Sequence, residues 1–118
     1  MGLSVEQLAL LDETKEVRID TGGPVTTIIW IVVSAGDPFI RSVQGEDGIW
    51  YQRVRANPRV AIVVGDDRIE FDAIHVDDSA VIDAVSDALR AKYPPGGSLD
   101  RMTRDEVLNT TLRLSPIS

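Results

Sequence analysis

Four arginines and two adjacent aromatic residues fall within one stretch of an otherwise acidic chain, residues 41–60, RSVQGEDGIWYQRVRANPRV. The arginines are Arg41, Arg53, Arg55 and Arg59, and the aromatic residues are Trp50 and Tyr51. The whole chain carries a net charge of -7, so this stretch is a local concentration of positive charge. Guanidinium groups bind phosphate, and aromatic rings stack on other flat rings. The stretch therefore indicates a site for an anion with a planar ring system.

The local pattern predicts a short helix that presents these side chains. Asp47 has the side chain of a helix-capping residue, and Trp50, Tyr51 and Val54 follow it. Asn57-Pro58 is expected to end the helix, because the residue before a proline is pushed out of the α region.

A loop that can hold phosphate is expected just before this helix. Ser42, Gln44 and Gly45 lie between a predicted strand and the helix, where the first N–H groups of the helix are free to bind an anion. The plainer alternative is that Trp50 and Val54, one turn apart, anchor the helix to the core, while the arginines face solvent or pair with the surplus carboxylates.

Several other chemistries are excluded or disfavoured by composition and motif. There is no cysteine, which excludes thiol nucleophiles and cysteine-based metal sites, and the single histidine, His75, cannot form a histidine metal site. We therefore expect no metal. No phosphate-binding loop of the GxxxxGK(S/T) type and no strand–GxGxxG–helix unit is present. The net charge of -7 argues against nucleic acid as a partner.

The length of 118 residues is typical of one domain, here residues 1–118. No apolar run reaches the roughly 20 residues of a membrane-spanning helix, and the first residues lack the features of a signal peptide. We expect a cytoplasmic protein with no membrane segment.

Hydrophobic periodicity predicts the elements that must position the site. Helical spacing is found over residues 4–13, where Ser4 and Gln7 form a capping box, and over residues 80–92 after the capping group Asp78. A further helical turn is expected over 103–107. Strand patterns are found over residues 16–20, 25–34, 39–43, 60–64, 68–76 and 109–114. The fold class is α+β, mainly β, a small antiparallel barrel of about six strands with an inserted short helix and a packing helix.

The strand over residues 25–34 is apolar on both of its faces. Ile29 and Ile31 alternate with Ile28, Trp30 and Val32, so both faces must be covered. One face can line the barrel core, and the other requires a helix, a ligand or a second subunit.

Three segments resemble the split β-barrel flavin- and deazaflavin-binding family related to pyridoxamine 5'-phosphate oxidase. They are Gly23-Pro24-Val25-Thr26-Thr27 at the entry to the long strand, Ile40-Arg41-Ser42, and the WYxxxxANPxV pattern from Trp50 to Val60. The likeness is nearest to the branch of deazaflavin-dependent nitroreductases and its small uncharacterised relatives, and it covers residues 17–76.

The resemblance implies a split barrel, a homodimer, and FMN or the deazaflavin F420 in a groove near the subunit interface. When this sequence is matched to the family position by position, Ser42, Gln44 and Gly45 are expected to lie by the cofactor phosphate. Arg53 or Arg55 is expected near the phosphate or the interface. Trp30 and Tyr51 lie near the ring or the substrate. The cofactor-binding residues expected in all are Trp30, Arg41, Ser42, Gln44, Gly45, Trp50, Arg53 and Arg55. Tyr51 is the candidate catalytic residue, orienting a small organic substrate or donating a proton during hydride transfer.

One departure from the family pattern keeps a second class of function open. Deazaflavin-binding members carry lysines in the loop after the strand serine, whereas here that loop contains Glu46 and Asp47. Carboxylates that face a phosphate repel it. The alternative is a non-catalytic split barrel that binds a flavin, haem or another planar anion, or a dimerisation module without a cofactor.

Overall fold

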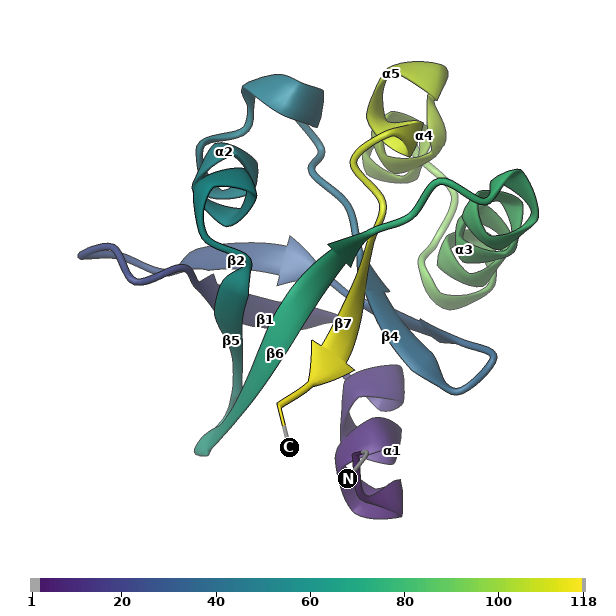
Figure 1. Cartoon of the computed structure of the whole chain (residues 1–118). Coiled ribbons are helices and arrows are strands. Elements are labelled where there is room, and N and C mark those ends of the chain that lie inside the picture. Colours follow the sequence, from purple (N-terminus) through teal and green to yellow (C-terminus); the bar gives the residue numbers. More distant parts are fainter. Residues whose placement is uncertain (1–2, 118) are drawn as a thin grey trace.

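The computed structural model describes residues 3–117 as one antiparallel sheet that curls into a nearly closed barrel, with helices around it (Figure 1). The strands follow the order β2-β1-β5-β6-β7-β4-β3 across the sheet. Their bounds are β1 Glu16–Asp20, β2 Thr27–Trp30, β3 Val32–Ser34, β4 Asp37–Ile40, β5 Arg59–Val64, β6 Asp67–His75 and β7 Leu112–Pro116. The predicted α+β split-barrel class is confirmed.

The barrel closes where the sequence predicted one long strand. β2 and β3 lie at the two opposite edges of the sheet, yet only Ile31 separates them along the chain. The two edges must therefore meet at Ile31. The prediction of a single strand over residues 25–34 is wrong for this reason, and the count of strands is seven rather than six.

Two side chains from the end of α3 (Ser79–Lys92) satisfy the backbone of Ile31 at this junction. The Ile31 N–H donates to the Tyr93 hydroxyl over 3.1 Å, and the Ile31 carbonyl accepts from Lys92 Nζ over 2.6 Å. Burial lowers the pKa of Lys92 to about 8 and raises that of Tyr93 to about 12, because both charged forms lose contact with water. The gap in the barrel is thus closed by side chains rather than by a strand pair.

Two helices follow the sequence prediction. α1 (Val5–Glu13) begins with the capping box of Ser4 and Gln7, and α3 begins at Asp78, whose carboxylate accepts from the Ala80 and Val81 N–H groups. α3 covers Trp30 and Val32. Val32 belongs to a second hydrophobic cluster, outside the barrel core, that also includes Phe39, Leu89 and Tyr93, and Trp30 packs against this cluster. A helix is therefore the cover for Trp30 and Val32, while Ile28 on the same face of the long apolar segment is 53% exposed.

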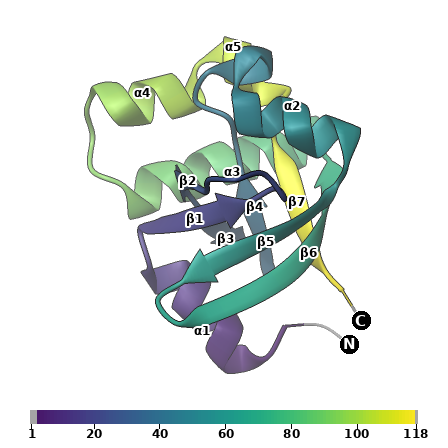
Figure 2. The same ribbon diagram turned by 90° about the vertical axis from the view of Figure 1, so that its left-hand side faces the viewer.

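The region between α3 and β7 contains two short helices, α4 (Gly97–Thr103) and α5 (Asp105–Leu108). The sequence predicted an irregular segment and one helical turn over 103–107, and this prediction missed α4. Leu99 and Met102, one turn apart, are buried against the α3 cluster and fix α4. Figures 1 and 2 show α2 (Ile49–Ala56), α4 and α5 at one end of the barrel and α1 at the other.

α2 is anchored by its apolar side chains but is not capped as predicted. Trp50 and Val54 are buried in the barrel core, and Asn57 ends the helix, as expected. Asp47 does not cap it: residues Gly45–Asp47 form a 3-10 turn, η1, and the N-cap of α2 is Gly48, with no side-chain cap. The η1 turn displaces the helix start beyond Asp47, so this prediction is wrong.

Within residues 3–117, no helix has both the length and the apolar character needed to cross a membrane.

Candidate functional site

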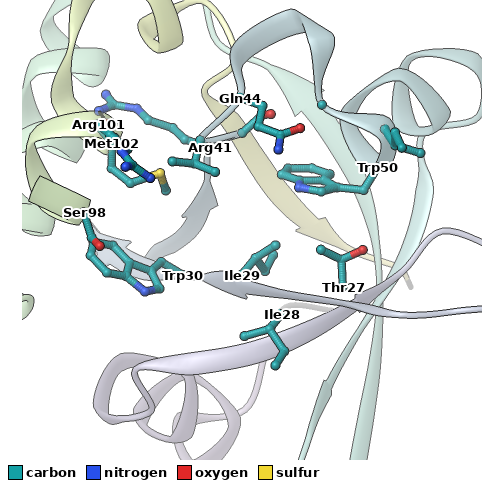
Figure 3. Close-up of a pocket in the computed structure, with 14 residues that line it drawn as sticks. Thr27, Ile28, Ile29, Trp30, Arg41, Gln44, Trp50, Ser98, Arg101 and Met102 are labelled. Atoms are coloured by element: carbon teal, nitrogen blue, oxygen red, sulfur yellow. Dashed lines mark hydrogen bonds between the residues drawn. The ribbon is translucent and has the colours of Figure 1, made fainter.

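A pocket of about 430 Å³ lies at the end of the barrel that carries α2 and α4 (Figure 3). Three segments far apart in the sequence form its walls, namely residues 27–30 of β2, residues 41–44 and 48–50 around the start of α2, and Ser98, Arg101 and Met102 of α4. Pockets of this size bind small organic molecules.

The charge of the pocket is opposite to that of the chain. Two arginines, Arg41 and Arg101, line it, and among residues 3–117 no carboxylate does, although the chain has 19 acidic residues against 12 basic ones. The indoles of Trp30 and Trp50 and the side chains of Ile29 and Met102 supply apolar surface. This combination suits a flat, anionic ligand.

Arg41 is the most deeply buried charge in the described part of the chain, with only 2% of its surface exposed. Its Nε donates to Thr111 Oγ1 over 2.8 Å, its Nη1 donates to Ser86 Oγ over 2.9 Å and to the Met102 carbonyl over 3.1 Å, and its Nη2 donates to the Ile82 carbonyl over 2.8 Å. Burial lowers the pKa of Arg41 to about 10, which leaves it cationic at neutral pH. Arg41, directly after β4, is tied to α3, α4 and the segment just before β7, and it places a fixed positive charge at the pocket wall.

Ser42 provides a hydrogen-bonding group that the protein itself does not use. The residue is 1% exposed, and among residues 3–117 its Oγ has no hydrogen-bond partner. Its backbone N–H donates to Thr110 Oγ1 over 3.1 Å, which fixes its position. A buried hydroxyl without a partner costs free energy, so an orphan in a pocket wall points to a ligand.

The start of α2 adjoins this hydroxyl. Gly48, its N-cap, packs so closely on Ser42 Oγ that a Cβ on Gly48 would overlap it. Gly48, Ile49 and Trp50 all line the pocket, so the first turn of α2 lies at its wall. The N–H groups of a first helical turn and the helix dipole favour an anion. Ser42 and the helix start therefore form one corner of the pocket whose hydrogen-bond donors suit an anion.

The two acids of the loop are not part of this pocket. Glu46 accepts a hydrogen bond from the side-chain amide of Asn109, and neither Glu46 nor Asp47 lines the pocket. The η1 turn carries both side chains outside the pocket lining, so neither carboxylate faces this pocket.

Five of the predicted site residues meet in the pocket, which Trp30, Arg41, Ser42, Gln44 and Trp50 all line. They come from β2, from the segment after β4 and from α2, so the fold brings together what the sequence separates. Their predicted role in cofactor binding stays a prediction.

The other four predicted residues lie outside the pocket lining. Gly45 has a φ of 67° and its N–H donates to the Ser42 carbonyl, so it shapes the turn before α2. Arg53 packs its guanidinium on Gly23, and Arg55 is an exposed residue of α2.

Tyr51, the candidate catalytic residue, is packed into the barrel core with 3% of its surface exposed. Its hydroxyl donates to the Asn109 carbonyl over 3.4 Å, and burial raises its pKa. Its ring meets that of Trp50 edge to face, with centroids 6.2 Å apart. Its predicted role would require access to a ligand that this position does not give within the single chain.

Sequence reasoning missed the wall that α4 contributes, with Ser98, Arg101 and Met102. The Pro94-Pro95-Gly96-Gly97 run obscured the helix, because such residues are typical of irregular segments. The spacing of Leu99 and Met102 was the signal that could have revealed it.

His75 takes no part in the pocket. Its Nδ1 lies 3.0 Å from Asp77 Oδ1 and its Nε2 lies 2.8 Å from the Asn109 carbonyl oxygen. Among residues 3–117, no group of three or more histidine, cysteine, aspartate or glutamate side chains is arranged to hold a metal ion.

Residues 7–114 match a family model described as an uncharacterized protein conserved in bacteria (DUF2255). The chain belongs to this family. A search of curated proteins gave no significant match to the DUF2255 chain.

Solved structures with the same fold include a proposed enzyme and two binding proteins. A proposed pyridoxamine 5'-phosphate oxidase from Listeria innocua matches with a TM-score of 0.68 and 15% identity, over 96% of the DUF2255 chain and 92% of its own. The heme storage protein HutZ from Vibrio cholerae matches with a TM-score of 0.62 and 17% identity, over 100% of the DUF2255 chain and 92% of its own. A FAD-binding protein from Mesorhizobium loti matches with a TM-score of 0.56 and 16% identity, over 100% and 93%. At these identities the likeness shows the fold of the DUF2255 chain, a split barrel of the pyridoxamine 5'-phosphate oxidase type.

Proposed function

We propose that this protein binds a flavin-type cofactor, FMN or F420, in the pocket between β2, α2 and α4, and that it serves as a small oxidoreductase. The observation that carries the proposal is a pocket with two indoles, two arginines, an orphaned buried hydroxyl and no carboxylate, in an acidic chain. The flavin-related descriptions of two structural neighbours support it.

The residues present fit such a group. Ser42 Oγ, the Gln44 side chain and the first N–H groups of α2 would hold the phosphate, and Arg41 would neutralise it through its fixed charge. Trp30 and Trp50 would flank the ring system. The bound flavin supplies hydride transfer, and the chain supplies position, exclusion of water and a positive field.

FMN is the first choice of ligand and F420 the second. FMN carries a single phosphate, whereas F420 adds a tail with several carboxylates. Among the described residues of the pocket lining, Arg101 is the only exposed cation, which matches one anionic group better than several.

A binding protein without catalysis is the second candidate, and one observation favours it. Among the described residues that line the pocket there is no His, Tyr, Lys, Asp or Glu, so none of them exchanges a proton near neutral pH. Haem as the ligand is less well supported. Among the described residues that line the pocket, only Met102 is of a type that serves as an axial ligand of haem iron.

A homodimer is part of the proposal. Ile28, Val43 and Ile49 line the pocket and are 53%, 40% and 68% exposed, and Val25, in the connection between β1 and β2, is 66% exposed. Apolar side chains gathered at the mouth of a pocket favour a covering partner. A second copy would cover them and close the pocket.

The test is a titration of the purified protein with FMN and with F420, in which binding is monitored by the melting temperature and by absorbance. Size-exclusion chromatography gives the oligomeric state. A ligand at 100 times its Kd stabilises the folded state by about 2.7 kcal/mol, which raises the Tm by several degrees. We expect FMN to give this shift on a dimeric protein. No shift with either compound at concentrations well above micromolar would refute cofactor binding, and a monomer at these concentrations would refute the dimer.

Gly48→Ala is expected to weaken FMN binding by about tenfold or more, which corresponds to the loss of one hydrogen bond to a charged group. The new methyl group would displace Ser42 Oγ, and both lie in the corner of the pocket that suits an anion. Gly23→Ala is the matched control, because its methyl group meets only the end of the flexible Arg53 side chain. Isothermal titration of both variants checks the prediction, and equal affinities would contradict it.

A further inference from the structure

We infer that Arg101, on α4, is the residue by which this pocket selects a phosphorylated ligand over its neutral analogue. The inference rests on the proposed function and extends it, because Arg101 lies outside every segment that carried the family resemblance.

The two arginines of the pocket differ in what they can do. The Nε and both terminal nitrogens of buried Arg41 already donate to protein acceptors. Its guanidinium therefore cannot reorient to hydrogen-bond a ligand without losing these bonds. Arg101 is exposed, and among residues 3–117 its side chain makes no ion pair and no hydrogen bond. Arg101 is therefore the cation of the pocket that is available to a ligand.

Arg101 is one of four exposed arginines that have no carboxylate within ion-pairing distance among residues 3–117, the others being Arg18, Arg53 and Arg55. Of these four, Arg101 alone lines the pocket. The carboxylates that surround the rest of the molecule are absent from the pocket lining. A charged ligand group would supply the missing partner.

The backbone that carries Arg101 is held firmly, although its side chain is not. The neighbouring Met102 is buried in the α3 cluster, and its carbonyl accepts from Arg41 Nη1 over 3.1 Å. The two cations thus stand on adjacent parts of one wall, and Figure 3 shows both on the side of the pocket away from Trp50. A phosphate group near this wall gains attraction from both positive charges. A neutral ligand does not.

The test compares FMN with riboflavin, which has the same ring system and no phosphate. Fluorescence titration gives the Kd of each for the unmodified protein and for Arg101→Gln, Arg101→Lys and Arg90→Gln. We expect Arg101→Gln to weaken FMN binding by about tenfold to a hundredfold, as for the loss of a hydrogen bond to a charged group, while riboflavin binding changes less than about twofold. Arg101→Lys should restore part of the preference. Arg90→Gln makes the same change in net charge on α3, outside the pocket, and should leave both affinities unchanged.

The outcomes separate the two levels of the proposal. If the unmodified protein binds neither compound, the proposed function and this inference both fail. If it binds FMN but Arg101→Gln keeps the same ratio of FMN to riboflavin affinity, or loses both affinities equally, the proposed function stands and the role of Arg101 is refuted.

Discussion

Replacing Arg41 by alanine is expected to lower the free energy of unfolding by about 3–5 kcal/mol, because several neutral buried groups lose their donor at about 1–3 kcal/mol each, while the cost of burying the guanidinium is relieved. The change deletes every hydrogen bond of the guanidinium and leaves the hydroxyls of Thr111 and Ser86 and two backbone carbonyls in a buried space. Those groups keep their desolvation cost and lose their donor. The loss of side-chain volume adds to the effect.

The measurement is urea unfolding followed by circular dichroism. Arg41→Met is the companion variant, because it keeps much of the apolar stem and isolates the loss of the donors. Arg90→Ala is the control, since Arg90 is exposed and pairs only with Asp87, and exposed pairs contribute about 0–1 kcal/mol. If Arg41→Met were as stable as the unmodified protein, the network would not hold α3, α4 and β7 together.

This role of Arg41 illustrates the limit of reading a site from sequence. The sequence placed Arg41 in a cofactor site, and the residue does line the pocket. Its partners, however, come from α3, α4 and the segment before β7, between 41 and 70 residues further along the chain. Local spacing carries no information on such contacts. A cationic residue in a motif can therefore both hold several elements together by hydrogen bonds and supply positive electrostatic potential to a pocket.

Local signals predicted local features well. The capping box of α1, the Asp78 cap of α3, the burial of Trp50 and Val54, and the end of α2 at Asn57 all depend on residues within a turn or two of each other. Asp47 failed as a cap because the η1 turn, which a glycine with φ of 67° at position 45 permits, competes for the same residues. The sequence was compatible with two short-range patterns, a helix cap at Asp47 and the η1 turn, and the folded chain adopts the η1 turn.

The crossing at Ile31 could not be predicted from periodicity. Residues 25–34 keep one alternating pattern throughout, so nothing in the pattern indicates that pairing changes from β1 to β4. The change is imposed by closure of the barrel, which brings the two sheet edges to the same residue. The donors that make the crossing possible, Lys92 and Tyr93, lie more than sixty residues further along the chain.

Tyr93→Phe tests whether this junction holds the barrel closed. The hydroxyl accepts from the Ile31 N–H over 3.1 Å and lies within hydrogen-bonding distance of the carbonyls of Ile31 and Lys15. Phenylalanine keeps the ring, which stacks on Trp30 at a centroid distance of 3.8 Å, but leaves a buried N–H without a partner. We expect the free energy of unfolding to fall by about 1–3 kcal/mol, the cost of one unsatisfied buried group.

Tyr51→Phe is the matched control for this prediction. The hydroxyl of Tyr51 makes one long hydrogen bond, 3.4 Å to the Asn109 carbonyl, so its removal should cost less than about 1 kcal/mol. Both variants are compared by urea unfolding and by amide hydrogen exchange of Ile31, which should accelerate only in Tyr93→Phe. Equal losses in the two variants would mean that the hydroxyl of Tyr93 does not hold the junction closed.

Trp30 forms part of the pocket wall and stacks on Tyr93. A loosened junction in Tyr93→Phe should therefore also weaken FMN binding, which links closure of the barrel to the shape of the proposed site.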